Sequence, residues 1–171
     1  MNSEHETPAE FRDLIGKTRV FTSPDEVGTI TIRRFAVAVG DTNRVYLDED
    51  YASTTCHGGT IAPPTLLFEL NHNVEEELSE EDGGHAHFLH MLPSFKPSFI
   101  RGGNSYEFYQ PVRPNDKITV REEISRIYTK EAKSGELTFV VTKNTYSNQK
   151  GELLGVNWET WIFPPNSRIE S

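Results

Sequence analysis

The sequence is poor in cysteine, in long apolar runs and in basic residues. Its 171 residues include one cysteine, Cys56, so no disulfide can form within the chain. No apolar stretch approaches the length of a membrane-spanning helix, and residues 1–11 lack the apolar core of a secretory signal, so we expect a cytoplasmic protein. Lys and Arg total 17 against 26 Asp and Glu. The net charge of −9 argues against binding to nucleic acid or to an anionic membrane.

The remaining composition is that of a globular protein. Hydrophobic residues make up 35% of the chain and charged residues 25%. This length is sufficient for one domain with a substantial core, so residues 1–171 are predicted to form a single domain. Residues 1–8 are polar and are expected to be flexible.

Residues 31–70 carry the most informative local pattern. Ile32, Phe35, Ala36 and Val39 have the spacing of one buried helical face, which Gly40 ends. Thr29 or Thr31 would cap this helix. Asp41 and Asn43 then follow at its C-terminal tip, where the helix dipole disfavours a carboxylate. Asp41 is therefore either a functional acid or a loop aspartate that caps local amides.

The two halves of the chain differ in predicted structure. A second helix is expected to begin at Pro63-Pro64, and residues 83–103 read as a long connection. After it, the alternation of apolar and polar residues predicts consecutive strands, with a turn expected earlier, at residues 23–26. Helices followed by antiparallel strands indicate an α+β fold. The predicted strands cover residues 104–110, 118–128, 137–146 and 153–163.

Residues 40–52, GDTNRVYLDEDYA, resemble the signature of the MaoC-like (3R)-hydratase/dehydratase family. Later stretches, IAPPTLLFEL, RGGNSYEFYQPVRPNDKITV and VTKNTYSNQKGELL, resemble its FAS1-like dehydratase branch, and the likeness covers about residues 10–163. The resemblance implies a hot-dog fold, in which a curved antiparallel sheet wraps around a central helix. It also implies a second hot-dog subunit, in a homodimer or a heterodimer.

The resemblance further implies a set of catalytic positions, of which this chain keeps a part. In the family, an aspartate and a histidine add water to an enoyl thioester or remove it from a (3R)-hydroxyacyl thioester, and a backbone N–H holds the thioester oxygen. Asp41 and Asn43 match the family pattern, but Tyr46 stands at the histidine position. Pro64 falls at the glycine that donates the N–H, and proline has none, so Thr65 is the next amide available.

Other side chains are weaker candidates. His57 either substitutes for the missing histidine or lies in a solvent-facing bend. Arg101, with Gly102 and Gly103, either meets a phosphate of the substrate or forms a turn before the next strand. Cys56 has no basic partner in the pattern and is expected to be a small buried thiol. His85, His87 and His90 lack the spacing of a zinc site, and neither a metal nor another cofactor is expected.

Three functions fit these residues. The first is a subunit of a MaoC-like hydro-lyase that acts on an acyl-CoA or acyl carrier protein thioester, with this chain as the half that lacks a full catalytic site. The second is an active homodimeric enoyl-CoA hydratase that uses Asp41 in a rearranged site. The third is a non-enzymatic module that binds acyl-CoA or serves as a structural part.

Overall fold

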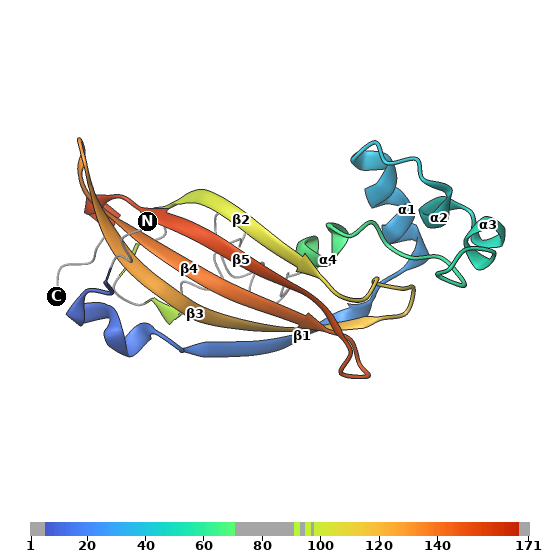
Figure 1. Ribbon diagram of the computed structural model, residues 1–171, viewed down its shortest axis with the longest axis horizontal. Helices are drawn as coiled ribbons and strands as arrows, with labels where there is room; N and C mark the ends of the chain where they lie inside the picture. Colours follow the sequence, from blue (N-terminus) through green and yellow to red (C-terminus); the bar gives the residue numbers. More distant parts are fainter. Residues whose placement is uncertain (1–5, 71–90, 93–94, 97, 168–171) are drawn as a thin grey trace.

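A five-stranded antiparallel sheet forms the main body of the protein in a computed structural model (Figure 1). The structure describes residues 6–70, 91–92, 95–96 and 98–167. The strand order is β1-β3-β4-β5-β2, which leaves β1 and β2 at the edges. The strands are β1 (Thr18–Glu26), β2 (Ile100–Phe108), β3 (Lys117–Ala132), β4 (Gly135–Ser147) and β5 (Leu153–Phe163).

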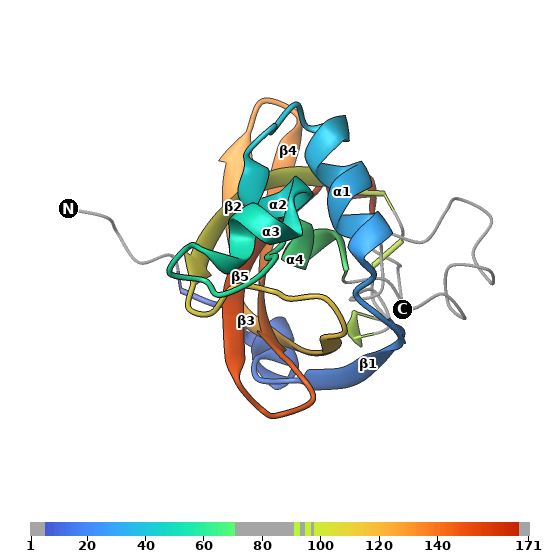
Figure 2. The same cartoon turned by 90° about the vertical axis from the view of Figure 1, so that its right-hand side faces the viewer.

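Short helices occupy both ends of the sheet. Three of them, α1 (Thr29–Ala38), α2 (Arg44–Leu47) and α3 (Glu49–Ser53), form a lobe beyond one end of the strands (Figures 1 and 2). A fourth, α4 (Leu66–Glu69), lies on the inner side of the curved sheet (Figure 2). The 3₁₀-helices η1 (Ala9–Leu14) and η3 (Pro165–Ser167) flank β1 and β5 in sequence.

Alternation along the strands separates a concave face from a convex one. On β3, the apolar residues Ile118, Val120 and Ile124 are buried, which fits the predicted alternation, and Glu122 on the same face is buried as well. Apolar residues of the concave face form two clusters. One cluster includes Val120, Tyr146 and the α4 residues Leu66 and Leu67. The other includes Ile124, Ile127, Val140, Trp161 and Phe163.

Aromatic contacts hold α4 against the sheet. The Phe68 ring stacks on Tyr106 at 4.4 Å between centroids and meets the edge of Tyr146 at 5.1 Å. Gly155 permits this approach, because a Cβ there would lie 2.8 Å from Leu67 Cδ2 and 3.1 Å from the Glu107 carbonyl oxygen.

Several local predictions are wrong. Strand β2 begins at Ile100, so Arg101, Gly102 and Gly103 lie in a strand and not in a connection or turn. Strand β1 continues through the expected turn at residues 23–26; Pro24 is tolerated there because β1 is an edge strand. Val39 is exposed because it follows the last helical residue of α1.

The N-cap of α1 is also not the one expected. Gly28 occupies that position, without a side-chain cap, in place of Thr29 or Thr31. Other expectations fall outside the described residues: the continuation of the Pro63-Pro64 helix, most of residues 83–103, and His85, His87 and His90. None of the helices within the described ranges is long and apolar enough to cross a membrane.

Candidate functional site

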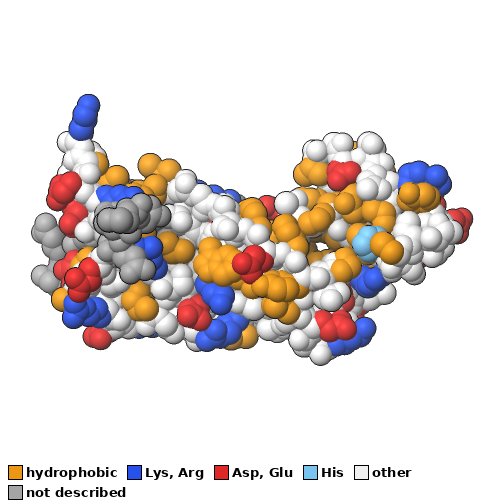
Figure 3. Space-filling view, in the orientation of Figure 1, with side chains coloured by type: hydrophobic (Ala, Val, Ile, Leu, Met, Phe, Trp, Pro, Cys, Tyr) orange, Lys and Arg blue, Asp and Glu red, His pale blue; other side chains and the backbone are white. Residues whose placement is uncertain are grey.

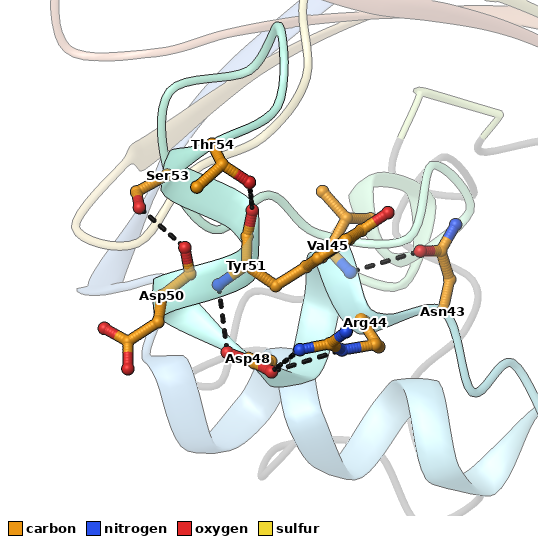
Figure 4. Close-up of polar contacts among 8 residues, drawn as sticks. All are labelled: Asn43, Arg44, Val45, Asp48, Asp50, Tyr51, Ser53 and Thr54. Atoms are coloured by element: carbon orange, nitrogen blue, oxygen red, sulfur yellow. Dashed lines mark hydrogen bonds and ion pairs between the residues drawn. The ribbon is translucent and has the colours of Figure 1, made fainter.

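The loop after α1 is shaped by the side chains of the family motif. Gly40, with φ of 73°, turns the chain out of the helix. Asp41 Oδ1 accepts a hydrogen bond from the Asn43 N–H at 3.1 Å. Asn43 Oδ1 accepts one from the Val45 N–H at 3.1 Å (Figure 4). Asn43 is therefore the N-cap of α2, and Asp41 uses one carboxylate oxygen to hold the loop.

Asp48, also part of the motif, caps α3. Its Oδ1 accepts from the Tyr51 N–H at 3.0 Å, while its Oδ2 accepts from the Arg44 guanidinium at 2.6 Å (Figure 4). The Tyr51 N–H first, and Arg44 second, lower the pKa of Asp48. Much of the motif thus stabilises two consecutive short helices, which explains its dense polar composition.

Tyr46 is buried in the apolar cluster that contains α4. Burial first, and the Asp41 carboxylate second, raise the pKa of the Tyr46 phenol. The phenol therefore stays protonated at neutral pH, where it can donate a hydrogen bond but cannot serve as a base. Asp41 thus acts electrostatically on the tyrosine that stands at the position of the family histidine.

The segment before α4 joins the motif to the sheet. The Ile61 N–H donates to the Val45 carbonyl at 3.5 Å, and the Ala62 N–H donates to the Val112 carbonyl at 2.8 Å. Pro64 and Thr65 are exposed at the start of α4. Pro64 offers no N–H, whereas the Thr65 N–H has no acceptor within the part of the chain that the structure describes.

His57 is half-buried in the loop after α3. Its N–H donates to Thr55 Oγ1 at 3.2 Å, and its carbonyl accepts from the Arg113 guanidinium at 2.8 Å. Within the described ranges, no hydrogen bond or ion pair joins the His57 side chain to Asp41 or Tyr46. Cys56, next to it, is exposed, contrary to the expected buried thiol.

Arg101 is held by an ion pair on the concave side. Its Nε lies 2.6 Å from Glu159 Oε1, and its guanidinium lies over the Trp161 ring at 5.2 Å. Gly102 serves packing, because a Cβ there would come within 2.9 Å of Ile162, where the β2–β5 register shifts. Gly103 has open space beside it.

Two buried carboxylates, Glu122 and Glu159, were not singled out from the sequence. Burial is the main cause that raises the pKa of Glu159 to about 7; Glu122 and Glu69 add to the rise, while Arg101 opposes it. A sequence signal exists for Glu122, which shares the strand register of Val120 and Ile124. Among the described residues, no three His, Cys, Asp or Glu side chains are grouped so that they could hold a metal ion.

The model of the FAS1-like, dehydratase domain region matches residues 14–155. The chain belongs to this dehydratase family. A UPF0336 protein of Streptomyces coelicolor is 32% identical over 116 residues, which cover 68% of this chain and 72% of that protein. A probable enoyl-CoA hydratase alpha subunit of Thermomonospora curvata is 30% identical over 151 residues; the match covers 82% of this chain and 46% of that longer protein.

Solved structures confirm that this chain has the hot-dog fold. The MaoC-like dehydratase from Rhodospirillum rubrum superimposes with a TM-score of 0.65 at 19% identity, over 92% of this chain and 94% of that one. A chain of the ChsH1-ChsH2 complex from Mycobacterium tuberculosis gives a TM-score of 0.71 at 14% identity, over 95% and 90%. The predicted family and fold are thus confirmed.

Proposed function

We propose that this chain is the half of a MaoC-like hydratase/dehydratase that lacks a full catalytic site. It would assemble with a second hot-dog subunit whose Asp/His pair carries out the chemistry on enoyl or (3R)-hydroxyacyl thioesters. Support comes from the family and from the relative described as an alpha subunit of an enoyl-CoA hydratase, a description that belongs to a multi-subunit enzyme.

The observation that carries the proposal is the buried, protonated Tyr46 at the position of the family histidine. Hydration needs one group that takes a proton from water and one that supplies a proton to the α-carbon. Asp41 is engaged with its own loop, and Tyr46 stays protonated at neutral pH. Pro64 removes a third element, since loss of one such backbone donor typically lowers the rate about 100- to 1000-fold.

Edge strand β2 is the surface that favours a second subunit. All nine of its residues are exposed, and its Ile100, Tyr106 and Phe108 side chains are large and apolar. On the face drawn in Figure 3, hydrophobic side chains are also visible over the middle of the sheet and over the lobe formed by α1, α2 and α3. Strand β1, at the other edge, contains Pro24 and an irregular register, which weaken it as a pairing edge.

The thioester would approach through Thr65 and the β2 strand. The Thr65 N–H, which has no acceptor among the described residues, would donate to a thioester oxygen in place of the missing donor at Pro64. Arg101 is 57% exposed and would contact a phosphate of CoA or of an acyl carrier protein while still paired with Glu159. Gly102 and Gly103 would keep the backbone beside that phosphate uncrowded.

A hydration assay with a trans-2-enoyl-CoA tests the proposal, following loss of the conjugated thioester absorbance. We expect negligible turnover by the chain alone and turnover when it is mixed with a hot-dog partner that has an intact Asp/His pair. Asp41→Asn should leave the activity of the mixture unchanged. Full turnover by the chain alone, abolished by Asp41→Asn, would instead establish the homodimeric hydratase. Thioester binding without turnover in any combination would establish the binding module.

A further inference from the structure

A row of polar side chains crosses the whole concave face of the sheet. Strand register places Arg19 opposite Glu122, Glu122 opposite Asn144, Asn144 opposite Asn157, and Asn157 opposite Tyr106. Each of the five strands thus contributes one member to what we call the polar band (Arg19, Glu122, Asn144, Asn157 and Tyr106).

The polar band separates the two apolar clusters. On β3, Val120 belongs to the cluster around α4 and Ile124 to the cluster around Trp161, with Glu122 between them. All three side chains are at most 3% exposed. The concave face is therefore apolar, then polar, then apolar along the strands.

The centre of the polar band has unmet capacity to accept hydrogen bonds. Asn144 is 2% exposed and Asn157 is 4% exposed, yet neither Asn144 Oδ1 nor Asn157 Oδ1 has a hydrogen-bond donor within the described residues. Buried amide oxygens are nearly always paired. The Tyr146 hydroxyl is also buried and has no hydrogen-bond partner among the described residues. A hydroxyl group fits this set, because it can donate to an amide oxygen and accept from a phenol.

The charges around this centre favour a neutral donor over an anion. Glu122 lies on the β3 side of the two asparagines, and Glu159 lies two residues from Asn157 on β5. Glu159 is only 6% exposed and already pairs with Arg101. A phosphate or carboxylate placed here would meet two acidic side chains at short range. Tyr146 keeps its proton here, because burial raises the pKa of its phenol.

Building on the proposed function, we propose that the polar band binds a hydroxyl group carried along the acyl chain of the thioester. Alkyl segments on either side of that hydroxyl would contact the two apolar clusters. A plain alkyl chain in the same position would leave the Asn144 and Asn157 oxygens unpaired, so the hydroxylated chain binds more tightly.

Calorimetric titration of the purified chain tests this selectivity. The probes are dodecanoyl-CoA and a set of its monohydroxy derivatives, with the hydroxyl at successive carbons beyond the β-carbon. We expect at least one derivative to bind about 5- to 10-fold more tightly than dodecanoyl-CoA, the gain of one or two neutral hydrogen bonds. Derivatives that all bind within about 2-fold of dodecanoyl-CoA would overturn the inference, because neutral hydrogen bonds would then contribute nothing.

Substitutions test whether the preference for a hydroxylated acyl chain depends on the polar band. Asn144→Leu and Asn157→Leu should each abolish the preference while dodecanoyl-CoA still binds, whereas Thr145→Val, on the convex face next to Asn144, should preserve it. Preference that survives both leucine variants would exclude the polar band. If a leucine variant does not fold, the wild-type comparison decides alone.

The outcomes also separate this inference from the proposed function. Binding of dodecanoyl-CoA without preference refutes only the hydroxyl site. Absence of binding by every probe, together with no hydration in any mixture, refutes both.

Discussion

Glu159 is a buried carboxylate, and its ionisation makes the free energy of unfolding depend on pH. Its pKa is raised from about 4.5 to about 7 in the folded protein, mainly by burial. Between these values the folded chain binds more protons than the unfolded chain, so stability falls as pH rises. The stability that protonated Glu159 contributes to the folded protein is fully present below about pH 4.5 and is lost as pH rises through about 7.

The Glu159→Gln substitution measures this contribution. The difference between about 4.5 and about 7 corresponds to about 3 kcal/mol. Glutamine keeps the shape but cannot ionise, so we expect the variant to gain about 2 to 3 kcal/mol relative to wild type between about pH 4.5 and about pH 8. Urea denaturation of both proteins across this range gives the free energy of unfolding of each as a function of pH.

Glu123→Gln is the matched control. Glu123 lies on the adjacent convex side of β3, where it pairs with Arg121 at 2.9 Å on the surface. Such surface pairs contribute at most about 1 kcal/mol, so Glu123→Gln should change the free energy of unfolding by no more than that. Curves for wild type and Glu159→Gln that run parallel over the whole pH range would refute the argument, because Glu159 would then ionise equally in both states.

Three further predictions concern packing, capping and reactivity. Gly155→Ala should destabilise the fold by about 1 to 3 kcal/mol in urea denaturation through its clash with Leu67, whereas Gly103→Ala, with open space, should not destabilise it. Asn43→Ala should lower the free energy of unfolding by about 1 kcal/mol, because α2 loses its N-cap. An unchanged urea midpoint would show that the cap is dispensable. Cys56 should react with a thiol reagent in the native protein at a rate close to that of a free thiol; protection until unfolding would contradict its exposure.

The strand half of the fold was predictable because its pattern is local. Alternation in residues 118–128, 137–146 and 153–163 reflects a sheet with one buried face, and strands β3, β4 and β5 occupy these regions. Strand boundaries at residues 23–26 and 100–103 were missed. Proline and glycine pairs resemble turns in sequence, yet pairing with β3 and β5 keeps these segments extended.

Part of the candidate site could be predicted from the sequence. The motif around Asp41 could be located from its resemblance alone, including the replacement of histidine by Tyr46. Its hydrogen bonds could not, since an aspartate that caps a loop and one that performs catalysis look alike in a linear pattern. The pairing of Arg101 with Glu159 was equally hidden, because 58 positions separate them and only strand pairing brings them together.

By itself, the sequence determined the family, the antiparallel strands and the absence of the usual histidine and amide donor. Residue identity and short spacing carry this information. The tertiary structure alone decided which polar residues share the concave face. The polar band takes one residue from each of five strands that lie far apart in sequence, and their register is set by hydrogen bonds between strands and by burial of one face.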